Sequence, residues 1–211
     1  VAALADLGHD PYPIGVAAPT HRINDLDWGS VEPVRVAGRI KHIRNHGGVT
    51  FATLVDGADS IQVMLERDLL GADHVEHFRR FVDTADLVAL TGTLAQSRNE
   101  TPALAVTSWQ VLAKSLHPVP FDRFEDPETR LRQRVTDLVV HPEAGTLLVA
   151  RSKIVSAVRR TLDHAYFTEV ETPILQTVHG GASARPFKTF SNTYGMDLSM
   201  RIAPELYLKR L

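Results

Sequence analysis

Two tight-turn signals, Gly47-Gly48 and Asp56-Gly57, divide residues 34–65 into short segments of alternating character. The first segment has small or apolar residues on one side, namely Val34, Val36, Gly38 and Ile40. On or near its other side are Arg35, Arg39 and Lys41. Because successive strand side chains point to opposite faces, this pattern predicts a half-buried strand with a basic outer face. Both turns suit hairpins, so we expect two more strands, over 49–55 and 60–65.

A helical segment over about 70–82 follows the third strand, and two further strands are expected over 87–94 and 103–112. Five strands with a helix after the third are typical of an OB-fold barrel, although other small β-barrels share this number of strands. We predict an all-β OB-fold domain over 31–116, preceded by a helix and an extended arm over 1–30.

Two prolines in the run from His117 to Phe121 favour an extended connector, which we place over 117–135. Beyond it, apolar side chains recur at helical spacing: Leu147, Leu148, Ile154, Val155, Val158 and Leu162. Basic side chains occupy other positions of the same segment: Arg151, Lys153, Arg159 and Arg160. The pattern predicts an amphipathic helix with a basic flank. Its apolar stripe is compatible with an interface between subunits or with ordinary core packing.

The last 32 residues contain two runs with chemical meaning, Gly180 to Phe187 and Arg201 to Lys209. A glycine pair lets the backbone pass close to a ligand or adopt a positive φ. A carboxylate such as Glu205, after Pro204, can pair with an ammonium group. Taken singly, each run equally suits a turn and a helix start, since proline and glutamate are both favoured in a first helical turn.

In this order, the two runs resemble those of bacterial class II lysyl-tRNA synthetases, and the segment from Phe167 to Leu175 resembles the first signature motif of that class. The resemblance implies the first part of an α+β catalytic domain, an antiparallel sheet with helices, over 136–211. It also implies that Gly181 contacts the amino-acid head of lysine and that Glu205 pairs with its α-ammonium. Arg201 is expected to be structural.

The same resemblance implies that the barrel reads the central uridine of a lysine tRNA anticodon through Arg44, Phe51 and Gln62. An aromatic ring can stack on a base, polar groups can contact its edges, and basic groups can contact phosphates. Core packing is the alternative for Phe51, and simple solvent exposure is the alternative for Gln62. Thr101 stands where the family has a glutamate that reads a neighbouring base, and Glu100 is one residue away.

Lysine activation joins the carboxylate of lysine to the α-phosphate of ATP, a reaction that depends on orientation and on charge stabilisation, normally by arginines and Mg²⁺. The family carries those arginines in motifs that we expect beyond Leu211, so no catalytic residue is assigned within this chain. The helix and strand over about 146–175 are expected to form a homodimer interface. The expected function is a lysine-tRNA ligase; the alternative is a tRNA-binding or dimerisation module without catalytic activity.

A formal net charge of −2 gives the chain no overall attraction for a polyanionic partner, so nucleic acid would bind through local basic patches. Cysteine is absent and the histidines lack ligand spacing, so no thiolate site and no metal site are expected. No apolar run is long enough to span a bilayer, and no membrane contact is expected. The cytoplasm is the expected location.

The run from Asn192 to Leu198 resembles a subgroup in which the synthetase module is fused behind a membrane-embedded lysyl-phosphatidylglycerol synthase. In that case the protein would lie at the cytoplasmic face of the membrane and would supply lysyl-tRNA for lipid lysylation. Because the first residue is Val1, we expect the chain to be an internal piece of a longer product.

Overall fold

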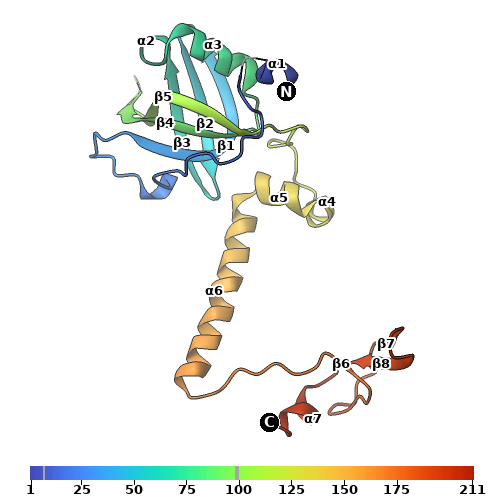
Figure 1. The fold of residues 1–211 in the computed structure, drawn as a ribbon. Coiled ribbons are helices and arrows are strands. Elements are labelled where there is room, and N and C mark those ends of the chain that lie inside the picture. The colour runs from blue at the N-terminus through green and yellow to red at the C-terminus, as the bar shows by residue number, and fades with distance from the viewer. Residues whose placement is uncertain (7, 98–99) are drawn as a thin grey trace. The chain divides into compact units, whose positions relative to one another are not determined.

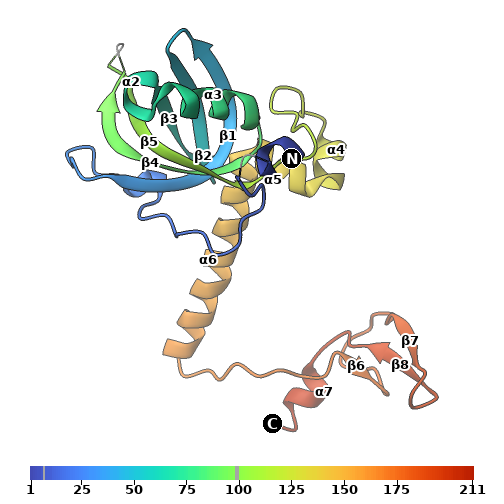
Figure 2. The same cartoon turned by 45° about the horizontal axis from the view of Figure 1, so that its top comes forward.

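The computed structural model describes residues 1–6, 8–97 and 100–211; Leu7, Arg98 and Asn99 lie outside the described residues. The chain divides into two compact units, Val1–Ala150 and Arg151–Leu211. Figures 1 and 2 show the elements of both units in two views. Among the described residues, none of the helices combines the length and the apolar character that crossing a membrane requires.

The first unit is built on a closed barrel of five strands, and Figure 1 shows it at the N-terminal end of the colour range. Its strands are β1 (Val34–His46), β2 (Val49–Asp56), β3 (Asp59–Glu66), β4 (Leu87–Gln96) and β5 (Pro102–Ala113). The order around the barrel is β1-β2-β3-β5-β4, and pairing of β1 with β4 closes it. The β3–β5 pair is parallel and the other pairs are antiparallel. The predicted OB-fold is confirmed, including the helix after the third strand.

That helical segment is split into α2 (Arg67–Leu70) and α3 (Ala72–Phe81) at Gly71, whose φ of +93° favours glycine. Helix α3 covers one end of the barrel (Figures 1 and 2) and places Val75, Phe78 and Phe81 in the barrel core. The strands contribute their inward-facing residues to the same core, with Val36, Ile40 and Leu54 among those that are fully buried. Alternation over residues 34–40 therefore predicted which face of β1 is buried there.

One irregularity in β1 changes which side chains face outward. The register of β1 against β2 shifts between Ile40 and His42, so Lys41 is an extra residue in the pairing. Ile40 pairs with the inward-facing Leu54, whereas beyond the shift Ile43 packs against the core. A bulge of this kind reverses the side-chain alternation of the rest of the strand. Arg44 consequently faces outward.

The N-terminal arm packs against the barrel. It contains the helix α1 (Ala2–Ala5) and the short helical turn η1 (Ile23–Asp25). Leu4, Ile23 and Leu26 are buried in the barrel core. The ring of His9 is stacked on Trp109, with 5.5 Å between the ring centroids. The arm is thus part of the first unit and not a free extension.

After the barrel, the chain forms α4 (Pro127–Arg132) and α5 (Arg134–Val140), which are joined through the buried side chain of Asp137. Asp137 Oδ1 accepts hydrogen bonds from Arg130 Nε (2.7 Å) and His141 Nδ1 (3.0 Å), and Oδ2 accepts one from Arg134. Burial alone would raise the pKa of the Asp137 carboxyl. The hydrogen bonds from Arg130 and His141 and the charges of Arg130 and Arg134 hold that pKa below its ordinary value of 3.8. The carboxylate is therefore ionised at neutral pH and ties the two helices together.

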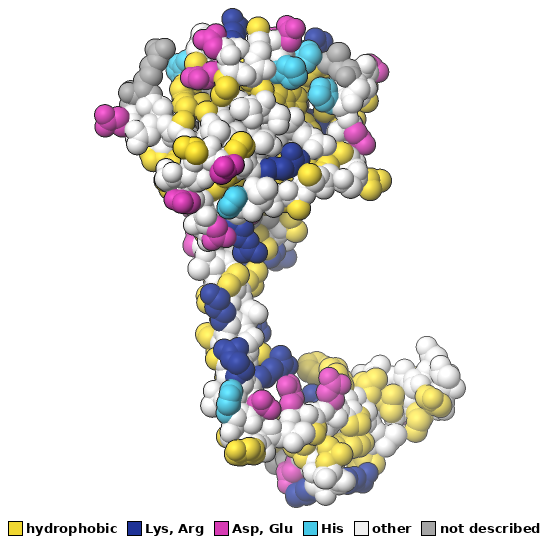
Figure 3. All heavy atoms as spheres, turned by 60° about the vertical axis from the view of Figure 1, so that its left-hand side comes forward, with side chains coloured by type: hydrophobic (Ala, Val, Ile, Leu, Met, Phe, Trp, Pro, Cys, Tyr) yellow, Lys and Arg dark blue, Asp and Glu magenta, His cyan; other side chains and the backbone are white. Residues whose placement is uncertain are grey.

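Helix α6 (Pro142–His164) contains the division between the two units. Its predicted apolar stripe is exposed: Leu147 is 68% exposed, Ile154 65% and Val158 53%. Figure 3 shows hydrophobic and basic side chains along this helix. The amphipathic helix is therefore present, and core packing within the described residues does not account for its apolar stripe.

The second unit has a small antiparallel sheet in the order β6-β8-β7 and ends with the helix α7 (Glu205–Leu208). Its strands are β6 (Leu175–Gln176), β7 (Lys188–Ser191) and β8 (Met196–Met200). The strand expected to follow α6 forms only at Leu175–Gln176; residues 167–174 have no strand. A strand requires partners for its backbone groups, and within the described residues only β8 pairs with β6.

Gly92 of β4 lies against the backbone of β5, and we predict that it does not tolerate a side chain. A Cβ at this position would lie 2.1 Å from the carbonyl oxygen of Ala105. Gly92→Ala should therefore force the two strands apart and lower the free energy of unfolding by about 1–3 kcal/mol. Denaturant unfolding monitored by fluorescence would measure the change.

Gly145→Ala in α6 is the matched control, because a Cβ there meets no atom within 4 Å. Alanine is favoured over glycine in helices, so this variant should be neutral or stabilising by up to about 1 kcal/mol. Equal effects of the two variants would contradict the close approach at Gly92.

Candidate nucleic-acid interface and amino-acid site

Strand pairing brings the three predicted anticodon residues to one outer face of the barrel. Arg44 of β1 is directly opposite Phe51 of β2, and Phe51 is directly opposite Met64 of β3. Gln62 precedes Met64 by two residues and so shares its face. The order across the strands is therefore Arg44, Phe51 and Met64, with Gln62 diagonal to the ring of Phe51.

Phe51 packs on a small apolar cluster outside the barrel core. The cluster consists of the buried Met64, Ala103 and Ala105, with Phe51 and Ala95 partly buried against it. Ala103 and Ala105 contribute only small side chains to this cluster. Phe51 remains half-buried, so core packing inside the barrel, the alternative considered for this residue, does not occur.

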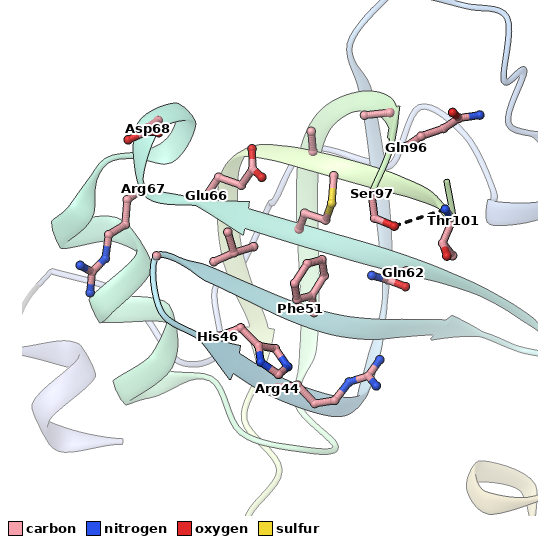
Figure 4. Close-up of a pocket in the computed structure, with 15 residues that line it drawn as sticks. Arg44, His46, Phe51, Gln62, Glu66, Arg67, Asp68, Gln96, Ser97 and Thr101 are labelled. Atoms are coloured by element: carbon pink, nitrogen blue, oxygen red, sulfur yellow. Dashed lines mark hydrogen bonds between the residues drawn. The ribbon is translucent and has the colours of Figure 1, made fainter. Parts of the chain in front are cut away.

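A hollow of about 980 Å³ lies over this face, and its lining includes Arg44, Phe51 and Gln62. Figure 4 shows Phe51 in the middle of the hollow, with Gln62 on one side and Glu66 on the other. Within the described part of the chain, the side chains of Arg44, Gln62 and Glu66 make no hydrogen bond and no ion pair. An aromatic ring and uncommitted polar groups thus share one concave surface.

Several residues of this hollow were not predicted from the sequence, among them His46 and Glu66. The ring of His46 meets that of Phe51 edge to face, with 6.1 Å between the centroids. His46 follows Arg44 by two positions and Glu66 follows Gln62 by four, so both share a strand face with a predicted residue. An even spacing along the strand from Arg44 and Gln62 was therefore the sequence signal that could have identified His46 and Glu66.

Another side of the hollow is formed by residues next to the end of β4 and the start of β5. Ser97 and Thr101 line it, and the backbone N–H of Thr101 donates to Ser97 Oγ at 3.3 Å (Figure 4). Glu100, with φ of +58°, lies in the turn itself. Thr101, which we expect at the position of the family's glutamate, therefore lines the hollow.

Helix α3 holds the β1–β2 turn beside the hollow. Arg79 donates to the carbonyl oxygens of Gly47 (2.9 Å) and Val49 (3.3 Å) and to the hydroxyl of the fully buried Thr50 (2.7 Å). His46 is next to this turn, so its position depends on a contact between the helix and the turn. The side chains that line the hollow therefore lie on paired strands and next to turns that hydrogen bonds hold in place.

In the second unit, the structure brings Gly181 and Glu205 together. Gly181 has φ of +87°, and a Cβ placed on it would lie 3.4 Å from Glu205 Cβ and 3.6 Å from Glu205 Oε2. Glu205 is also the first residue of α7 and forms an ion pair with Lys209 at 2.6 Å. Both interpretations of Glu205, ligand pairing and a helix start, are compatible with this position.

Arg201 lies next to the same segment and has a structural contact. Its guanidinium donates to the carbonyl oxygen of Thr172 at 2.8 Å and to the hydroxyl of the same residue. Over the residues that the structure describes, no group of three or more His, Cys, Asp or Glu side chains could hold a metal ion.

Two domain families match the chain, and together they cover most of it. Residues 34–112 match the OB-fold nucleic acid binding domain, which corresponds closely to β1–β5. Residues 126–211 match class II tRNA synthetases of the D, K and N group. The second match begins at Asp126, the residue that caps the N-terminus of α4.

The chain is similar over nearly its whole length to proteins named lysylphosphatidylglycerol biosynthesis bifunctional protein LysX. It is 48% identical to that of Mycobacterium ulcerans and 46% to that of Mycobacterium tuberculosis, over 99% of the chain in each case. The identity to that of Rhodococcus jostii is 44%, over 100% of the chain. The chain spans only 19%, 18% and 19% of the length of these three relatives, respectively.

Proposed function

The chain is an OB-fold nucleic-acid-binding domain followed by the start of a class II synthetase domain of the D, K and N group, and we propose that it is the tRNA-reading and lysine-binding part of a lysine-tRNA ligase. The observation that carries this proposal is the arrangement of Arg44, Phe51 and Gln62 around one hollow on the barrel. We retain 1–30 as the arm, 31–116 as the barrel domain, 117–135 as the connector and 136–211 as the start of the catalytic domain.

In the proposed complex, the central anticodon base stacks on Phe51. Stacking requires an accessible ring face, and the ring is half-buried with the hollow beside it. Gln62 offers both a donor and an acceptor to the edge of the base. The exposed Arg44 side chain can pair with a phosphate. Proteins commonly recognise single-stranded bases by this combination of stacking, hydrogen bonds to the base edge and phosphate contacts.

In the second unit, the proposed ligand is lysine, with Glu205 pairing with its α-ammonium and Gly181 lying under its amino-acid head. The proximity of Gly181 to Glu205 supports this proposal, because a side chain at 181 would occupy the space beside the carboxylate. The carboxylate is half-exposed and already accepts a cation, that of Lys209. A ligand ammonium would compete with Lys209 for it.

The chemistry proposed for the full-length protein is attack of the lysine carboxylate on the α-phosphate of ATP, with release of pyrophosphate, followed by transfer of lysine to the 3′ end of tRNA. Mg²⁺ would supply charge stabilisation on the phosphates in such a reaction. The residues described contribute binding and orientation of lysine and of the anticodon, which place the reactants and do not transfer protons.

A second candidate function is favoured by the relatives. They are named for lysylphosphatidylglycerol biosynthesis and as bifunctional proteins, and each is about five times as long as this chain. The ligase would then supply lysyl-tRNA to a lipid-lysylating part of the same protein. Lysine-dependent aminoacylation of tRNA by the full-length protein separates both candidates from a binding module without catalytic activity, which would give none.

The barrel proposal predicts that Phe51→Ala weakens binding of a lysine tRNA anticodon stem-loop by about 1–3 kcal/mol, the range for one base stacked on an aromatic ring. Fluorescence anisotropy with the full-length protein would measure it. Val55→Ala, an outward-facing change on the same strand outside the hollow, should leave the affinity unchanged. Loss of affinity in both variants, or in neither, would contradict the stacking role.

The lysine proposal predicts that Glu205→Gln weakens lysine activation by about 1.5–3 kcal/mol, the range for a hydrogen bond to a charged group, because the ammonium of lysine loses its counter-charge. Lysine-dependent pyrophosphate exchange by the full-length protein is the assay. Lys209→Met breaks the same ion pair from the other side and leaves the carboxylate free, so activation should persist. If the two variants lower only the melting temperature, and by similar amounts, Glu205 is a helix-start residue.

The exposed stripe on α6 supports a homodimer of the full-length protein through this helix. Val158→Asp should convert the dimer to a monomer in sedimentation experiments, because a carboxylate would be buried among apolar side chains. Ser156→Asp introduces the same group on an exposed polar position of the helix and should leave the dimer intact. A wild-type monomer at micromolar concentration would contradict the proposed dimer.

A further inference from the structure

Glu66 places a negative charge inside a hollow that is proposed to receive RNA. It is the last residue of β3, it is directly opposite Val49, and it is half-buried beside the apolar cluster under Phe51. A carboxylate repels phosphate, so its presence in an RNA site requires an explanation. In Figure 4 it lies on the side of Phe51 away from Gln62 and Thr101.

The fold holds Glu66 in place without using its carboxylate. The backbone N–H of the next residue, Arg67, donates to the carbonyl oxygen of Gly48 at 3.3 Å, which joins the end of β3 to the β1–β2 turn. Glu66 precedes α2, but its side chain makes no capping hydrogen bond to that helix. Among the described residues, the carboxylate also has no ion-pair partner. Its hydrogen-bonding capacity is therefore available to a ligand.

The spacing along β3 relates Glu66 to the stacking position. Gln62, Met64 and Glu66 lie on the same face, and Met64 is the residue opposite Phe51. Two residues of a strand span about 7 Å, so Glu66 and Gln62 lie about 7 Å to either side of the row that contains Phe51. A base stacked on Phe51 therefore has one neighbour on the side of Gln62, Ser97 and Thr101, and the other on the side of Glu66.

We propose that Glu66 is a specificity-determining residue that accepts a hydrogen bond from an N–H group of the base next to the one stacked on Phe51. An ionised carboxylate only accepts hydrogen bonds, so it favours a base that presents a donor to it and disfavours one that presents a carbonyl oxygen. The opposite side of the hollow has hydroxyl and amide groups, which can both donate and accept hydrogen bonds and therefore do not select between the two kinds of base. This inference rests on the proposed function of the barrel as an anticodon reader.

The test uses RNA stem-loops in which the central uridine is fixed and each neighbouring base is varied through all four bases. Binding to the full-length protein is measured for wild type and for Glu66→Gln, which removes the charge and adds a donor. We expect the affinity of wild type to differ among the four bases at one neighbouring position. Glu66→Gln should reduce that difference in affinity at least fivefold and should leave the differences in affinity at the other neighbouring position unchanged. Asp59→Asn, the loss of a charge at the opposite end of β3, should behave as wild type.

If the Glu66 carboxylate only repels phosphate and does not contact a base, the binding data will differ. Glu66→Gln would then raise the affinity for every stem-loop by the same factor, and the ranking of bases would not change. Such a uniform change, or no change, overturns the inference. Glu66→Asp, which keeps the charge on a shorter side chain, should lower the affinity for the preferred base more than for the others; if it preserves the wild-type ranking and affinity, contact with the base is also contradicted.

Failure of the inference and failure of the proposed function are distinguishable in the same data. If wild type binds no stem-loop, or if Phe51→Ala binds every stem-loop as wild type does, the barrel is not an anticodon reader. If wild type and Phe51→Ala behave as proposed while Glu66→Gln keeps the ranking of bases, only the role of Glu66 is wrong. Circular dichroism confirms that each variant remains folded.

Discussion

The parallel pairing of β3 with β5 is the constraint on which the candidate interface depends. It aligns Gln62 with Ala103 and Met64 with Ala105, and it lets the five strands close into a barrel. The same pairing builds the apolar cluster under Phe51 from one side chain of β3 and two of β5. Barrel closure and the surface that supports the aromatic ring are therefore one structural feature, and disruption of the pairing would remove both.

Alternation and turn chemistry were sufficient to predict the strands, because each strand buries one face and each hairpin carries its own turn signal. They were not sufficient to predict the interface. Counting by twos from Ile40 would place Arg44 inside the barrel; the bulge at Lys41 turns it outward beside Phe51. A bulge depends on pairing with the neighbouring strand, which no local pattern in β1 records. The family resemblance selected Arg44 correctly for this face where alternation would not have done.

In the second unit, too, local sequence patterns did not predict which residues lie together. Gly181 and Glu205 are 24 residues apart, and only the resemblance indicated that they meet; the structure places a Cβ at 181 within 3.4 Å of Glu205 Cβ. The strand expected after α6 formed only at Leu175–Gln176, because strand formation depends on partner strands and not on the segment alone. Exposure of the apolar stripe on α6 likewise follows from tertiary context that the helical period cannot specify.

Photochemical cross-linking tests most directly whether the barrel face with Phe51 reads the anticodon. A lysine tRNA anticodon stem-loop with 4-thiouridine at the central position would be irradiated with the full-length protein, and the cross-linked peptide would be identified by mass spectrometry. We expect attachment within β2 or β3, at residues 49–66. Attachment confined to α3 or to the N-terminal arm, or equal attachment by a stem-loop of scrambled loop sequence, would contradict it.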